Sequence, residues 1–229
     1  MARWWTKPPI ILAALGVLAV LLPARLLRTP ITQRTPGTGS GEQALQEALT
    51  TSRQRAQAQP ETYLPEVATT LHSLGLLYRD TQRPRESEQA YQEALTIRRQ
   101  LAQAQTQAYL PEVATTLHSL GLLYRDTQRL REGEQALQEA LAMYRQLAQA
   151  QPQAYLPKVA MTLHNLGIVQ LDQEDLPQAQ TLMTEALTIR RALWKHRAEA
   201  EGNDLGQSLA VEIMVPQRQE EAVTLICER

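Results

Sequence analysis

The chain has 229 residues, of which 43% are hydrophobic but only 4% aromatic, with no phenylalanine. Ala, Leu, Gln, Glu and Arg dominate it, and all five favour helices, whereas a sheet protein would draw on β-branched and aromatic residues. The 23 basic and 24 acidic residues are dispersed, so the basic surface that nucleic-acid binding requires is not expected. A lone cysteine, Cys227, excludes an intramolecular disulfide and a cysteine-based metal site.

Residues 1–28 differ from the rest and predict a membrane anchor or a signal segment. The uncharged run 10–22 is shorter than the roughly 20 residues that cross a bilayer as a straight helix, and its length is typical of a signal peptide. The adjacent tryptophans Trp4 and Trp5 suit an interfacial anchor and favour an uncleaved apolar helix. We therefore expect a single-pass anchor at residues 4–27, with the remainder on the extracytoplasmic side of the membrane. The alternatives are cleavage to a secreted or periplasmic protein, or a helix buried in the core.

Residues 29–41 predict a flexible linker. Two prolines and three glycines fall within this segment, and both residue types interrupt helices and strands. A segment of this composition behaves as a tether between the parts that flank it.

An internal repeat organises residues 42–200. Residues 63–83 and 109–129 are identical, and a third, diverged copy begins at Tyr155. Register-equivalent histidines recur every 46 residues, at His72, His118 and His164. The predicted array consists of a half repeat at 42–59 and full repeats at 63–107, 109–153 and 155–199.

Each repeat predicts two helices. The first is expected to start at Pro65, where a helix start tolerates proline, and the second to run from Pro84 to about Ala104, with a turn at residues 80–83. One glycine recurs in the middle of each first helix, which indicates that the paired helix comes too close for a side chain. These glycines are Gly75, Gly121 and Gly167. A single hairpin cannot bury its apolar faces alone, so neighbouring hairpins are expected to stack.

This pattern resembles the tetratricopeptide repeat. The residues that carry the resemblance are Leu74, Gly75, Tyr78, Ser87, Tyr91 and Ala94, then Leu120, Gly121, Tyr124, Gly133, Leu137 and Ala140, then Leu166, Gly167, Gln170, Ala179, Met183 and Ala186. The unit is longer than the standard motif of about 34 residues and lacks its final proline, so it looks more like the kinesin-light-chain type found in bacteria. The resemblance implies an all-α fold, a right-handed α-solenoid of helix-turn-helix repeats that binds a peptide or protein in its concave groove.

The same resemblance indicates which side chains line that groove. They form a stripe about 130° around each first helix from its apolar core stripe. The predicted groove residues are Thr69, His72, Leu76 and Arg79, then Thr115, His118, Leu122 and Arg125, then Met161, His164, Ile168 and Leu171. The lysine and asparagine set that grips a terminal carboxylate in some family members is absent, so a clamp for a chaperone tail is not expected.

No catalytic residue, metal site or cofactor is predicted, because no phosphate loop, zinc-binding helix motif or nucleophile elbow is present. The repeated histidines suggest a metal-binding or pH-responsive row, but first helices about 10 Å apart suit chelation poorly. We expect these histidines to face water or to form local hydrogen bonds. The paired arginines at 98–99 and 190–191 are likewise expected on solvated helix faces, with an acidic partner as the alternative.

Residues 201–229 depart from the period and predict a degenerate C-terminal capping hairpin, with Trp194 covering the junction. Taken together, the sequence predicts a membrane-tethered protein-interaction scaffold that is not an enzyme. The alternative is a structural protein that forms homo-oligomers through the open ends of its repeat array.

Overall fold

The structure is a computed structural model, and it describes residues 38–104 and 106–201. Within those ranges the secondary structure is entirely α-helical. The helices are α1 (Thr38–Ala58), α2 (Pro60–Asp80), α3 (Pro84–Ala104), α4 (Thr106–Asp126), α5 (Leu130–Ala150), α6 (Pro152–Asp172) and α7 (Leu176–Glu201). The predicted anchor, most of the predicted linker and the predicted C-terminal hairpin beyond Glu201 lie outside the described residues.

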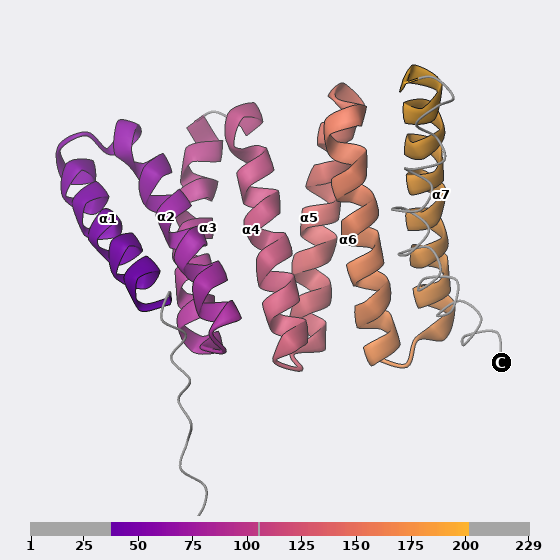
Figure 1. Ribbon diagram of the computed structural model, residues 1–229, viewed down its shortest axis with the longest axis horizontal. Coiled ribbons are helices and arrows are strands. Elements are labelled where there is room, and N and C mark those ends of the chain that lie inside the picture. Colours follow the sequence, from indigo (N-terminus) through magenta and orange to yellow (C-terminus); the bar gives the residue numbers. More distant parts are fainter. Residues whose placement is uncertain (1–37, 105, 202–229) are drawn as a thin grey trace, which may run out of the picture. The chain divides into compact units, whose positions relative to one another are not determined.

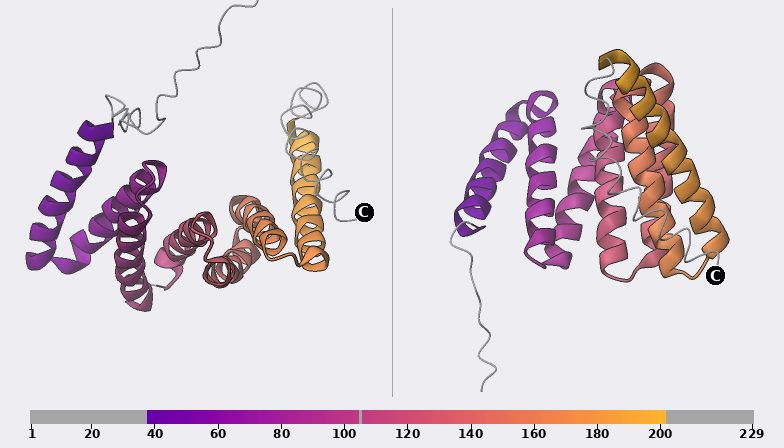
Figure 2. Two further views of the ribbon diagram at one scale, coloured as in Figure 1. Left: turned by 90° about the horizontal axis from the view of Figure 1, so that it is seen from below. Right: turned by 45° about the vertical axis from the view of Figure 1, so that its right-hand side comes forward.

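The helices pack in chain order (Figure 1). Each helix contacts the one before it and the one after it, and α2 also touches α4, as α4 touches α6. Figure 2 shows this row of alternating helices from two other directions. Helices α2, α4 and α6 are the first helices of the three repeats, and α1, α3, α5 and α7 are second helices. This is the stacked-hairpin order that the sequence predicts, while the right-handed twist of the array stays a prediction.

Two helix starts differ from the sequence prediction. Helix α2 begins at Pro60, so Pro65 lies inside it, and the equivalent prolines lie inside α4 and α6. A proline near the helix start removes only the hydrogen bond to the carbonyl four residues earlier, which the first helices tolerate. Helix α1 begins at Thr38, so residues 38–41 extend the half repeat and do not belong to a flexible linker.

The two helices of each hairpin are joined by a turn with one residue in the left-handed region. These residues are Gln82, Gln128 and Glu174, with φ of 57°, 61° and 64°. In the first hairpin, Thr81 N–H donates to Leu77 O and Arg83 N–H to Tyr78 O, which satisfies carbonyls at the end of α2. The same pattern recurs in the second and third hairpins, so all three reverse direction in the same way.

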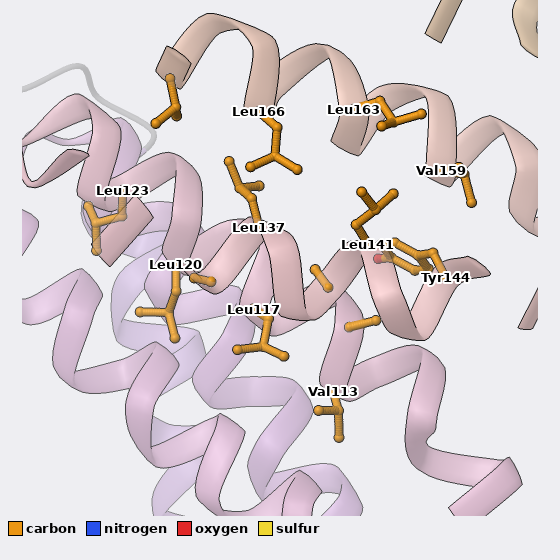
Figure 3. Packing of buried hydrophobic residues seen from close by; sticks show 14 of the residues in the cluster. Val113, Leu117, Leu120, Leu123, Leu137, Leu141, Tyr144, Val159, Leu163 and Leu166 are labelled. Atoms are coloured by element: carbon orange, nitrogen blue, oxygen red, sulfur yellow. The ribbon is translucent and has the colours of Figure 1, made fainter. Parts of the chain in front are cut away.

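Two clusters of buried hydrophobic residues fill the space between the hairpins, and Figure 3 shows part of the larger one. The middle first helix contributes Leu117 and Leu120, which lie in one cluster with Leu137 of α5 and Leu163 and Leu166 of α6. All five side chains are almost fully buried. The hydrophobic face of each hairpin is therefore covered only when the next hairpin is present.

Ion pairs with the period of the repeat join successive second helices. Arg99 of α3 contacts Glu139 of α5 at 2.6 Å, and Arg145 of α5 contacts Glu185 of α7 at 2.5 Å. Arg53 and Glu93 form the equivalent pair between α1 and α3. About half of each arginine side chain is exposed, so each pair contributes no more than about 1 kcal/mol.

Candidate partner-binding groove on the first helices

All twelve predicted groove residues lie on the first helices α2, α4 and α6. We call the four contributed by one helix a step of the groove. The described part of the chain has three exposed large hydrophobic side chains, Leu76 (36% exposed), Met161 (40%) and Leu176 (43%). The first two belong to the predicted groove, on the first and third steps. The stripe therefore offers apolar surface to a ligand.

The sequence left two environments open for the histidines, water or local hydrogen bonds, and His118 is buried and hydrogen-bonded. His118 is only 7% exposed, and its Nδ1 lies 3.1 Å from Thr162 Oγ1, while its Nε2 lies 3.2 Å from Asn165 Nδ2. Thr162 Oγ1 already donates to Lys158 O, so the imidazole donates from Nδ1 and accepts at Nε2. His118 is thus a neutral side chain that joins α4 to α6.

His72 has the same local sequence but different surroundings. Its ring lies 5.2 Å from the ring of Tyr91, and its buried Nδ1 has no hydrogen-bond partner. The residue that takes the place of Thr162 one repeat earlier is Thr116, whose hydroxyl oxygen accepts a hydrogen bond from Arg98 at 2.5 Å. The hydrogen bond that His118 makes is therefore not repeated by His72.

The environment keeps all three groove histidines neutral. Burial, with Arg98 and Arg79 nearby, lowers the pKa of His72 to about 4. Burial also lowers the pKa of His118 to about 4, with Lys158 and two groove arginines acting in the same direction. The pKa of His164 is lowered as well, by burial and then by Arg190 and Arg125. At neutral pH these side chains carry no charge, so the charge of the groove comes from other residues.

The groove arginines are partly exposed and face carboxylates on their own helices. Arg125 Nη2 lies 2.8 Å from Asp126 Oδ1, and Arg79 lies 3.6 Å from Asp80. About a quarter of each arginine side chain is accessible. The equivalent residue of the third step, Leu171, is half-buried and apolar.

Three cations near the groove were missed by the sequence reasoning, and one of them, Arg190, was expected on a solvated face but is half-buried. Arg98, expected on a solvated face, is 6% exposed, and its Nη1 donates to Thr116 Oγ1 and to Glu112 O at 3.2 Å. The equivalent positions one repeat before and after hold Ser52 and Tyr144, both fully buried. Because the equivalent residues of the neighbouring repeats are uncharged, the sequence did hold a sign that the position of Arg98 is buried. Lys158, whose Nζ lies 5.6 Å from the centre of the Tyr144 ring, gave no such signal.

Neither a metal site nor a membrane-spanning helix is found in the described part. No group of three or more His, Cys, Asp or Glu side chains that could hold a metal ion occurs in residues 38–104 and 106–201. None of the described helices combines the length and the apolar character needed to cross a bilayer. The predicted anchor at residues 4–27 lies outside the described residues.

Stacked helical hairpins with one partly apolar, partly cationic stripe on their first helices define a helical-repeat scaffold. A sequence model of the tetratricopeptide repeat matches residues 41–100 and 112–192, which is more than half of the chain. The chain belongs to the tetratricopeptide repeat family, whose repeats generally mediate protein–protein interaction.

Solved structures similar to the chain include the following two. That of pilF from Pseudomonas aeruginosa shares 20% identity and a TM-score of 0.42, and the match covers 83% of this chain and 78% of that one. That of BtubC from P. vanneervenii shares 15% identity and a TM-score of 0.40, with coverage of 84% and 92%. No curated protein matches the chain.

Proposed function

We propose that this chain is a scaffold that binds a peptide or protein segment along the stripe of α2, α4 and α6. The observation that carries the proposal is the exposure of Leu76 and Met161 on that stripe. Both side chains lie on the stripe that lines the ligand groove in tetratricopeptide arrays, and a segment bound there would remove their apolar surface from water. The stripe also holds Arg79 and Arg125, which can orient a bound segment through directed hydrogen bonds.

Aspartate substitutions on the stripe test this proposal. The probe is a phage-displayed library of random 16-residue peptides, selected on the full chain in mild detergent. We expect the selected peptides to lose binding to Leu76→Asp and Met161→Asp, because a charge on the apolar surface opposes its burial. Leu176→Asp is the matched control, since Leu176 is equally exposed but lies at the start of α7. Equal binding to all three variants would show that the peptides do not bind along the stripe of α2, α4 and α6.

The proposal includes a membrane tether at residues 4–27. The support is the sequence alone, a short apolar run with adjacent tryptophans and flanking basic residues. We expect the chain to sediment with membranes and to keep Trp4 and Trp5 at its mature N-terminus, with protease reaching the repeats only from the extracytoplasmic side. A mature N-terminus near residue 25 would indicate a secreted or periplasmic form instead.

A second candidate is self-association through α1. Ala44 and Ala48 are exposed on this helix, whereas the register-equivalent Ala90 and Ala94 of α3 are buried under the first helix of their own repeat. Helix α1 has no such partner among the described residues, which leaves this face open for a second copy. Light scattering of the full chain in detergent tests it, and Ala44→Glu with Ala48→Glu is expected to reduce the mass to that of a monomer. A concentration-independent monomer before substitution excludes this candidate.

A further inference from the structure

The three steps of the groove are not equivalent. Helices α2 and α4 present the same residue types, because the two segments are identical in sequence over residues 63–80 and 109–126. Helix α6 replaces the threonine with Met161 and the arginine with Leu171. The groove thus has two steps that each hold an arginine and a leucine, followed by a step whose methionine, isoleucine and leucine include no arginine, so its two ends differ chemically.

Cations surround the groove histidines, and one carboxylate, Glu112 of α4, acts on the buried Arg98. The charged side chains that act on the three histidines are all cations, and they include Arg79 and Arg125 from the groove itself. Lys158 and the half-buried Arg190 add to this set. No carboxylate acts on these histidines with comparable strength, so an anionic group entering the groove meets a favourable potential.

The groove arginines are available to a ligand. Asp80 and Asp126, which face them, are well exposed, with 69% and 43% of their side chains accessible. Ion pairs in such positions contribute little because water screens them. A guanidinium also has five N–H donors, so a carboxylate of the ligand can bind beside the aspartate or replace it.

The third step suits an apolar side chain. Met161 is 40% exposed, and Ile168 and Leu171, about two and three turns further along the same stripe, are half-buried. Methionine has a flexible, polarisable side chain that adapts to the shape of an apolar ligand. No arginine of this helix occupies the stripe.

We infer that the groove binds an amphipathic segment of a protein partner in one direction, with its carboxylates over α2 and α4 and an apolar side chain over α6. The inference rests on the proposed function and adds to it the chemistry and the orientation of the ligand. It follows from the order of the side chains along the stripe, two arginine steps and then a methionine and leucine step.

Peptides selected from the random 16-residue library against the full chain in detergent provide the test. Selected sequences are expected to carry acidic residues toward one end and large apolar residues toward the other. A synthetic copy of one such peptide is then compared with a peptide of reversed residue order, by fluorescence anisotropy at low and high salt. We expect the reversed peptide to bind at least about tenfold more weakly, and higher salt to weaken the binding of the original.

Matched variants locate the two ends. Arg79→Glu with Arg125→Glu is expected to weaken binding by more than about tenfold, because both carboxylate contacts become repulsive. Arg85→Glu with Arg131→Glu makes the same charge change at exposed positions of α3 and α5 and is expected to leave binding unchanged. Met161→Thr with Leu171→Arg gives α6 the threonine and the arginine that α2 and α4 carry on the stripe, and is expected to abolish the preference for one direction.

The outcomes separate this inference from the proposed function. Selected peptides whose binding depends on Leu76 or Met161 support the groove as the binding site. If such peptides lack acidic residues, or bind equally well in both residue orders, the inference is overturned while the proposed function stands. If no selected peptide depends on Leu76 or Met161, both the inference and the proposed function fail. The inference is also overturned if the Arg85 and Arg131 control loses as much binding as the groove variant, because net charge alone would then explain the effect.

Discussion

Gly75 lies so close to Tyr91 that a methyl group on its Cα would come within 2.6 Å of Tyr91 Cδ1. The same contact recurs at Gly121, which would meet Leu137 Cγ at 2.5 Å, and at Gly167. The second side chain of each pair is almost fully buried and has no room to withdraw. The closest approach of the two helices in every hairpin is therefore set by a glycine, as the sequence predicts.

Gly75→Ala is expected to destabilise the protein. Alanine is the better helix former by about 0.5–1 kcal/mol, but overpacking against Tyr91 costs about 1–3 kcal/mol. We expect a net loss of about 1 kcal/mol or more in the free energy of unfolding, measured by urea denaturation. Gly41→Ala is the control, because nothing lies within 4 Å of a Cβ at that position of α1, and this variant is expected to be as stable as the parent or more stable. Equal effects of the two variants would contradict the close-approach argument.

Gln82→Gly and Gln128→Gly are expected to stabilise the protein. Both glutamines have positive φ, 57° and 61°, a conformation that strains a residue with a Cβ by about 1–2 kcal/mol. Glycine relieves this strain but adds freedom to the unfolded chain, so the expected net gain is up to about 1 kcal/mol for each substitution. Thr81→Gly, one residue earlier with φ of −91°, is the matched control and is expected to lower the stability. The melting temperature followed by circular dichroism distinguishes the two results.

Acid is expected to destabilise the fold through His118. Its folded pKa of about 4 lies below the ordinary value of 6.5, so below pH 6.5 the unfolded chain binds a proton that the folded chain does not. The contribution of the neutral imidazole is therefore complete above pH 6.5 and is lost as the pH falls toward 4. For this one buried group the loss amounts to at most about 3 kcal/mol.

His118→Gln isolates that contribution. Glutamine keeps a donor and an acceptor near Thr162 and Asn165 but does not titrate in this range. We expect unfolding measurements between pH 7 and pH 4 to show a smaller drop in stability for the variant than for the parent. His72 has a similarly lowered pKa and continues to contribute in both proteins. Identical pH profiles would show that the His118 imidazole is not buried in its neutral form.

The repeat, the second helices and the glycine contacts were predictable because they depend on residues close in sequence. The expected second helix from Pro84 to about Ala104 coincides with α3. The first helices were predicted too short, since Pro65 suggested a helix start that the earlier Pro60 provides. Helix α4 begins at the equivalent residue Thr106 without a proline, so stacking against neighbours and not proline sets this boundary.

The environment of the groove histidines was not predictable from local sequence. His72 and His118 sit in identical segments, yet only His118 is buried and hydrogen-bonded. The difference arises one repeat later, where Asn165 replaces Ser119 and where Arg98 uses the hydroxyl of Thr116. Identical repeats thus acquire different side-chain contacts because their neighbours differ.

Arg98 and Arg99 offer a last test, because these adjacent residues lie in opposite environments. Arg98 is buried under α4 and hydrogen-bonded to Thr116 and to the carbonyl of Glu112, whereas Arg99 forms an exposed ion pair with Glu139. We expect Arg98→Ala to lower the free energy of unfolding by about 2–4 kcal/mol, since it leaves a cavity and removes charged hydrogen bonds. Arg99→Ala is expected to cost less than about 1 kcal/mol.

Arg98→Tyr separates the role of the charge from the role of the buried volume. The register-equivalent residue of the next repeat is Tyr144, whose ring is buried and whose hydroxyl lies 3.0 Å from Thr115 Oγ1. Thr115 belongs to the preceding first helix α4, while Lys158 of the following first helix α6 lies 5.6 Å from the centre of the Tyr144 ring. This fold therefore accommodates a tyrosine at this register, although its hydroxyl turns to the other neighbouring helix than the guanidinium of Arg98 does. If volume dominates, Arg98→Tyr restores most of the stability that Arg98→Ala loses, and the pKa of His72 rises because one of its two neighbouring cations is gone. A tyrosine variant as unstable as the alanine variant would instead show that the guanidinium hydrogen bonds hold α3 to α4.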